Sequence, residues 1–217
     1  MTLAAGVVEG VEMRRVVVVG VTGAGKTTLA AALARTLNIP HIELDAIQWR
    51  ENWAKAPLDE MLAALAQQTA GPGWVADGNY PKLRPALWPL ADTVIWLDYS
   101  LGLCLWRVLW RTLRRVLSKE LLWGVNRETI RNTLLARDGL LAWAVQTHGR
   151  YRREFEELMR GDDYVHLRWV RLRTPREAKR WLGYISAAKK PDPMMESGPG
   201  GRGGTRTPDL TDVNRAL

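Results

Sequence analysis

The chain has 217 residues, a length that suits one α/β core with additions better than two full domains. Lysine and arginine (31) outnumber aspartate and glutamate (23), and the formal net charge of +8 favours polyanionic partners such as nucleotides or nucleic acid. Cys104 is the only cysteine, which excludes an intramolecular disulfide. We expect a cytoplasmic protein without a membrane span, because the most apolar run, residues 101–117, contains four arginines and no signal-peptide pattern occurs.

The first predicted unit is a strand, a glycine-rich loop and a helix. Residues 14–19 (RRVVVV) are rich in β-branched side chains and end at a glycine, which is typical of a buried strand in a parallel sheet. Apolar residues recur at helical spacing over residues 26–37, and Asn38-Ile39-Pro40 ends that helix. Between them, residues 20–27 (GVTGAGKT) match the motif GxxxxGK[ST] in full.

This motif predicts a phosphate-binding loop, or P-loop. Its glycines let backbone N–H groups point inward at the positive end of the following helix. We expect Lys26 to bridge the β- and γ-phosphates of ATP and the Thr27 hydroxyl to ligate Mg²⁺. The residues predicted to bind ATP are Gly20, Thr22, Gly23, Ala24, Gly25, Lys26, Thr27 and Thr28.

Strands and helices then alternate along the chain. Further strands are predicted at residues 41–44, 74–76, 93–97 and 164–172, and further helices at 57–70 and 175–187. The alternation predicts a three-layer α/β fold with a five-stranded parallel sheet and the site at its carboxyl edge.

The predicted domain covers residues 14–187, and about 100–160 of these form an arginine-rich helical lid region. Residues 1–13 are predicted to be an N-terminal extension. Residues 188–217 are rich in proline, glycine and polar residues without an apolar period, so we expect a disordered tail.

Two carboxylates follow predicted strands. Asp45 comes after the second strand and Asp77 after the third, so both should lie at the sheet edge that carries the P-loop. A carboxylate there can hold Mg²⁺ or accept a proton from an attacking hydroxyl. The alternatives are a helix cap or turn for Asp45 and a plain turn for Asp77. Asp98, after the fourth strand, is a lower-ranked candidate.

Four arginines follow at spacings i, i+4, i+7 and i+8: Arg107, Arg111, Arg114 and Arg115. The spacing predicts that they lie near one face of a helix, with no acid among them. Such a face can stabilise charge on a transferred phosphoryl group, or it can be a solvated basic surface. The three histidines show no metal-ligand spacing with one another or with the cysteine, which favours structural roles for them.

Several segments carry a family resemblance: residues 42–45 (IELD), 74–80 (WVADGNY), 94–98 (VIWLD) and 122–128 (LWGVNRE). Together with the P-loop and the arginine face, they resemble the bacterial adenylate-kinase-related proteins often labelled DNA-topology-modulation (FlaR-like) proteins, over about residues 14–187. The resemblance implies the nucleoside-monophosphate-kinase fold, ATP binding and lid arginines over the phosphates.

One departure from adenylate kinases concerns the acceptor. Asp77-Gly78 occupies the place of their Asp-Gly-Phe-Pro-Arg element, but the sequence here continues Asn-Tyr-Pro and Arg84 comes several residues later. The resemblance therefore disfavours AMP as the acceptor.

The site predictions assign three sets of residues. The predicted catalytic residues are Lys26, Asp45, Asp77, Arg111 and Arg115. The predicted substrate-binding residues are Asp45, Trp49, Asp77, Gly78, Asn79, Arg84, Arg107 and Arg127. Thr27 and Asp77 are the predicted Mg²⁺ ligands.

Three functions fit these patterns. The favoured one is a kinase that moves the γ-phosphate of ATP to a nucleotide or other small acceptor. The alternatives are a DNA-associated ATP-binding protein that modulates DNA topology and a regulatory NTPase. Nucleic acid is the less favoured partner, because the sequence shows no recognition helix, zinc module or aromatic RNA-binding signature and the arginines lie where a kinase lid would be.

Overall fold

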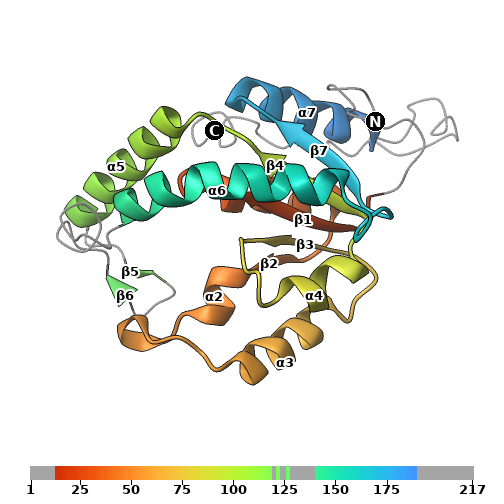
Figure 1. Ribbon diagram of the computed structural model, residues 1–217, viewed down its shortest axis with the longest axis horizontal. Helices are drawn as coiled ribbons and strands as arrows, with labels where there is room; N and C mark the ends of the chain where they lie inside the picture. Colours follow the sequence, from red (N-terminus) through yellow and green to blue (C-terminus); the bar gives the residue numbers. More distant parts are fainter. Residues whose placement is uncertain (1–12, 119–120, 123–125, 128–139, 190–217) are drawn as a thin grey trace, which may run out of the picture.

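The computed structural model describes residues 13–118, 121–122, 126–127 and 140–189 (Figure 1). Its centre is a five-stranded sheet in the order β2-β3-β1-β4-β7, and every neighbouring pair in it is parallel. The strands are β1 (Arg15–Gly20), β2 (His41–Glu43), β3 (Trp74–Asp77), β4 (Thr93–Leu97) and β7 (Arg168–Leu172). Strand β1 is central, so successive crossovers leave it in both directions and create a switch point at its carboxyl end.

Helices cover both faces of the sheet (Figure 1). One face packs against α1 (Lys26–Leu37) and α7 (Pro175–Ala188). The other packs against α3 (Leu58–Thr69), α4 (Arg84–Leu87) and α6 (Leu140–Arg160). The predicted three-layer fold is confirmed.

Several shorter elements and one long helix follow strands at the carboxyl edge of the sheet. They are α2 (Leu44–Gln48), η1 (Glu51–Trp53), α5 (Leu101–Ser118), β5 (Leu121–Leu122) and β6 (Asn126–Arg127), whereas η2 (Trp88–Leu90) precedes β4 at the amino edge. Strands β5 and β6 form a separate antiparallel pair, and β6 lies against η1.

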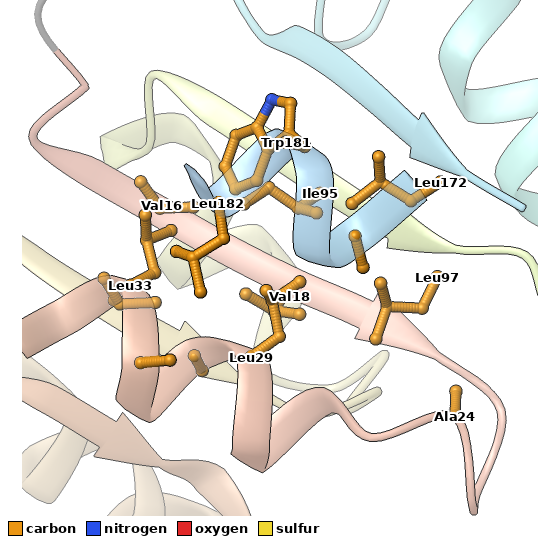
Figure 2. Close-up of a cluster of buried hydrophobic side chains, with 14 of the residues drawn as sticks. Val16, Val18, Ala24, Leu29, Leu33, Ile95, Leu97, Leu172, Trp181 and Leu182 are labelled. Carbon is orange, nitrogen blue, oxygen red and sulfur yellow. The ribbon is translucent and has the colours of Figure 1, made fainter. Parts of the chain in front are cut away.

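The valine run of β1 explains how the layers hold together. Val16 and Val18 point into the core under α1 and α7, whereas Val17 and Val19 point into the opposite core, and all four are at most 1% exposed. Figure 2 shows the first of these cores, where Leu29 and Leu33 of α1 meet the valines. Each fully buried side chain of this kind stabilises the fold by about 1.5–3 kcal/mol.

The ends of α1 and α7 follow from local chemistry. Asn38 ends α1 in the left-handed conformation (φ 55°), which asparagine tolerates better than most residues. Helix α7 begins after Thr174, whose side chain accepts a hydrogen bond from the backbone N–H of Glu177 at 3.2 Å.

Several predicted boundaries are wrong. The second strand ends at Glu43, because Leu44 and Asp45 already belong to α2. The fifth strand begins at Arg168 instead of Tyr164, because the intervening residues form a turn. Met13, assigned to the extension, is 7% exposed and packs into the core.

The rest of the predicted extension (1–12) and most of the predicted tail (190–217) lie outside the described residues, whereas Ala188 still belongs to α7. The lid region is described only through α5, β5, β6 and α6. No helix in the described part of the chain has the length and hydropathy needed to cross a membrane.

Candidate active site

The P-loop joins β1 to α1 and lies directly under α5. Gly23 (φ 80°) and Gly25 (φ 92°) have backbone angles that side-chain-bearing residues rarely adopt. A Cβ at Gly23 would lie 2.3 Å from the carbonyl oxygen of Cys104, so α5 approaches the loop too closely for any side chain there. The loop conformation that presents N–H groups to phosphate is therefore held by packing as well as by sequence.

Lys26 and Thr27 begin α1 and point toward acidic groups. The Thr27 hydroxyl donates a 2.7 Å hydrogen bond to Oδ2 of Asp77. Burial lowers the pKa of Lys26, while the negative charges of Asp45 and Asp77 act in the opposite direction and the positive charge of Arg111 adds to the lowering. The charges of Asp45, Asp77 and Arg111 therefore all lie within electrostatic reach of the Lys26 ammonium.

Asp77 ends β3 and is only 3% exposed. Its second oxygen, Oδ1, lies 2.8 Å from Nε2 of His41. The register of β2 against β3 pairs His41 with Val75, so His41 shares a sheet face with Asp77. His41 was expected to have only a structural role, and the sequence reasoning left it out of the site because the pairing register was unknown.

Asp45 lies in the first turn of α2 and accepts a hydrogen bond from the Tyr80 hydroxyl through Oδ1. Burial and then the charge of Asp45 raise the pKa of Tyr80, so this phenol stays a neutral donor. Tyr80 was missing from the predicted site residues. The signal that could have found it is its position two residues after Gly78, in the segment that carries Asp77.

Asn79 binds the start of the P-loop. Its Oδ1 accepts from the Gly20 N–H at 3.1 Å, and its Nδ2 donates to the Gly20 carbonyl at 2.7 Å. Asn79 was predicted to contact the substrate, but its side-chain amide binds the backbone at the end of β1. Gly78, also a predicted substrate contact, lies between Asp77 and this clamp.

The described arginine side chains of α5 are separated by their contacts and exposure. Arg107 donates to the carbonyl of Ala24 in the P-loop at 3.2 Å, and its guanidinium carbon lies 5.6 Å from the centre of the Tyr99 ring. Arg111 lies close enough to Lys26 to influence its pKa, whereas Arg114 is exposed.

Packing explains this separation. Helix α5 buries the stripe Cys104, Val108 and Thr112, all 0% exposed, and this choice of face turns Arg107 and Arg111 toward the loop. The side chain of Arg115 lies outside the described part of the structure. The same holds for Arg127, whose backbone belongs to β6.

Arg84, a predicted acceptor contact, is engaged elsewhere. Its Nη2 lies 2.5 Å from Oε1 of Glu154, and its guanidinium carbon lies 4.8 Å from the Trp88 ring centre. Its side chain is 15% exposed and lines a cavity of about 10 Å³, room for one water at most. Arg84 is thus not placed as an open anion clamp.

Trp49 and Asp98 complete the predicted set. Trp49 is partly exposed and packs edge-to-face on Trp53 at 5.7 Å, on the segment after α2. The carboxylate of Asp98 accepts two hydrogen bonds from Arg171, at 2.6 and 2.9 Å. Asp98 is therefore engaged in an ion pair with a residue of β7.

The donor set at the loop suits a magnesium ion. Mg²⁺ prefers hard oxygen ligands, few of them from protein, with the remaining positions filled by phosphate and water. The Thr27 hydroxyl and the Asp77 carboxylate supply two such oxygens in contact with each other. Among the described residues no cluster of three His, Cys, Asp or Glu side chains forms an all-protein metal cage.

Comparison with known proteins agrees with this geometry. Residues 16–87 match the profile of the ATPase family associated with various cellular activities (AAA). Shikimate kinase of Cereibacter sphaeroides is 32% identical over 152 residues, which cover 60% of this chain and 71% of the relative. This chain belongs to the family of P-loop kinases that includes shikimate kinase. The predicted activity, ATP-dependent phosphoryl transfer to a small acceptor, is confirmed at that level.

Solved structures of similar fold include two kinases. Shikimate kinase from Bacteroides thetaiotaomicron is 17% identical, with 82% of this chain and 98% of that chain covered and a TM-score of 0.49. A gluconokinase from Sinorhizobium meliloti is 20% identical, with 81% and 94% covered and a TM-score of 0.44.

Proposed function

We propose that this kinase binds ATP and Mg²⁺ through its P-loop and phosphorylates a hydroxyl group of a small molecule held beside Asp45. Backbone N–H groups of the P-loop at the start of α1 and the Lys26 ammonium bind the phosphates. Thr27 and Asp77 hold the magnesium ion, which when bound neutralises charge on the phosphates.

The observation that carries this proposal is the hydrogen bond between Thr27 of the P-loop and Asp77 at the end of β3, with the charges of Asp45 and Arg111 within electrostatic reach of Lys26. A cation and a guanidinium there can stabilise negative charge on the phosphoryl group during transfer. Asp45, whose Oδ1 accepts the Tyr80 hydroxyl, can accept the hydrogen bond of an acceptor hydroxyl through its other oxygen.

The acceptor is proposed to be small and to present a hydroxyl without needing an arginine clamp at Arg84. That arginine is paired with Glu154, which supports the expectation that AMP is not the acceptor. Trp49 and Arg127 remain the proposed acceptor contacts on the α2 and β6 side. Candidate acceptors to test are therefore shikimate, the sugar acids of gluconokinases and nucleosides.

The finer classification is also a proposal. We infer that the chain belongs to the branch labelled DNA-topology-modulation (FlaR-like) and acts in the cytoplasm, on the motifs of residues 74–80 and 122–128. The label does not require DNA binding. The bond of Arg107 to the Ala24 carbonyl of the P-loop and the effect of the Arg111 charge on Lys26 support a role in phosphoryl transfer over contacts with a DNA backbone.

The test combines an acceptor screen with matched arginine variants. Wild-type protein with γ-labelled ATP and Mg²⁺ should transfer label to at least one member of a panel of polyhydroxy acids, sugars, nucleosides and nucleotides. Arg111→Ala should lower kcat by roughly a hundredfold or more, and Arg111→Lys should recover part of it. Arg114→Ala, which removes an exposed arginine of the same helix, is the control and should leave kcat unchanged.

The opposite result would favour the DNA-associated alternative. In that case Arg111→Ala would keep full turnover while its affinity for DNA fell. The slope of log affinity against log salt would become shallower by about 0.9 for each lost phosphate contact.

A further inference from the structure

The segment Asp77-Gly78-Asn79-Tyr80 contacts three separate parts of the site through three different side chains. Asp77 binds the Thr27 hydroxyl at the start of α1. Asn79 binds Gly20 at the start of the P-loop. Tyr80 binds Asp45 in α2, on the acceptor side. The first two contacts belong to the ATP side of the site, and the third is left without a role in the proposed reaction.

The position of Tyr80 depends on close packing around Gly78. A Cβ at Gly78 would lie 3.0 Å from the Tyr80 ring and 3.0 Å from Cβ of Leu44. Leu44 precedes Asp45 in the chain and is 1% exposed. The missing side chain at Gly78 thus lets the Tyr80 ring reach the start of α2, where its hydroxyl meets Asp45.

The contact has a fixed direction. Because the phenol remains protonated, Tyr80 can only donate to the carboxylate, and the carboxylate can only accept. Tyr80 donates to Oδ1 of the Asp45 side chain. Among the residues that the structure describes, none donates a hydrogen bond to Oδ2.

Lys26 makes this arrangement consequential. Among charged groups, Asp45 has the largest effect on the pKa of its ammonium. The ammonium nevertheless donates its hydrogen bond to the Val21 carbonyl at 3.4 Å and not to Asp45. A carboxylate that is free to rotate could turn toward this cation. A carboxylate anchored through one oxygen keeps its orientation.

We propose that Tyr80 is a positioning residue whose hydroxyl anchors Asp45 through Oδ1 and leaves Oδ2 directed to the hydroxyl group of the acceptor. The inference rests on the proposed function, because it assumes that Asp45 orients the acceptor. It adds that one four-residue stretch, residues 77–80 at the end of β3, positions groups on the acceptor side of the site as well as on the ATP side.

The test is a double-mutant cycle on turnover. Tyr80→Phe keeps the ring and removes the donor. We expect kcat to fall about ten- to hundredfold with the best acceptor of the panel, as for the loss of a hydrogen bond to a charged group, while the KM for ATP stays within about twofold. Asp45→Asn should lower kcat by itself. Adding Tyr80→Phe to Asp45→Asn should then cause little further loss, because Tyr80 acts through the carboxylate.

The controls separate positioning from general structure. Tyr184→Phe removes the hydroxyl of an exposed tyrosine on α7 and should leave both constants unchanged. The melting temperature of Tyr80→Phe should lie close to that of the wild type. If the two substitutions lower kcat additively, or if Tyr80→Phe raises the KM for ATP as much as it lowers kcat, Tyr80 does not act through Asp45 and the inference is overturned.

The inference and the proposed function fail in different ways. Full kcat in Tyr80→Phe, with an active wild type and a damaged Asp45→Asn, would remove Tyr80 from the reaction and leave the kinase proposal intact. Full kcat in Asp45→Asn would overturn both the role proposed for Asp45 and the role of Tyr80. A wild type that transfers label to no acceptor would overturn both proposals together.

Discussion

The contact between the P-loop and α5 can be tested with two glycines of the same loop. Alanine at Gly23 would place a Cβ 2.3 Å from the carbonyl oxygen of Cys104 and 2.8 Å from Cγ2 of Val108. Alanine at Gly25 would meet only the tip of Arg107, at 3.4 Å. Both glycines have a left-handed φ, at 80° and 92°, so the pair differs mainly in the space available.

The expected magnitudes follow from these distances. Placing a side chain in the left-handed region costs roughly 1–2 kcal/mol at either position. At Gly23 the new methyl group meets backbone, which cannot move aside as a flexible side chain can, and overpacking of this kind adds about 1–3 kcal/mol. We therefore expect Gly23→Ala to lose about 2–5 kcal/mol of unfolding free energy, and Gly25→Ala about 1–2 kcal/mol.

Urea denaturation of the two variants without nucleotide measures the difference, provided that both keep the wild-type m-value. Measurement without ATP matters because either substitution also disturbs phosphate binding. Losses that agree within about 0.5 kcal/mol would show that α5 does not rest on the loop as described, since strain alone would then account for both.

Three further predictions concern single side chains. At an ATP concentration of 100 times Kd, the free energy of unfolding of the wild type should rise by about 2.7 kcal/mol, which raises Tm by about 5–11 °C for a chain of this size. Lys26→Ala should keep its fold and lose that rise. An equal rise in both proteins would contradict the role of Lys26. Burial raises the pKa of Cys104 to about 11. In the native protein at pH 8, Cys104 should therefore react with iodoacetamide roughly a hundredfold more slowly than a free cysteine, and in urea it should react at the ordinary rate. Fast labelling of the native protein would show that α5 opens readily. Arg171→Ala leaves the Asp98 side chain, which is 3% exposed, without its closest cation and should lower the free energy of unfolding by about 3–5 kcal/mol in urea denaturation. The double variant with Asp98→Asn should recover part of the loss. No loss in the single variant would show that the pair is dispensable.

The parts of the fold that the sequence predicts well depend on local patterns. The valine run before Gly20 has to be buried on both faces, and the motif at residues 20–27 specifies a loop between a strand and a helix. Asp45 and Asp77 could be assigned to one sheet edge because parallel strands end on the same side. None of these inferences needed a contact between distant residues.

Contacts that depend on register or on helix rotation could not be predicted. His41 meets Asp77 only because β2 pairs with β3 in one particular register. Tyr80 reaches Asp45 across 35 positions of the chain through a turn whose shape depends on Gly78. The spacing of the α5 arginines gave their angles around the helix axis but not which side would pack, and the buried stripe that begins at Cys104 decides that.

The placement of α5 bears on how the reaction would gain its charge stabilisation. The first two turns of α5 contact the P-loop through the Cys104 carbonyl beside Gly23 and through Arg107 on Ala24. Arg111, one turn further, already influences Lys26. A guanidinium held in place before the substrates arrive needs no reorganisation during transfer, which is the condition under which electrostatic stabilisation is most effective. We therefore expect the kcat loss of Arg111→Ala to be similar for good and poor acceptors, because its target is the phosphoryl group that all of them share.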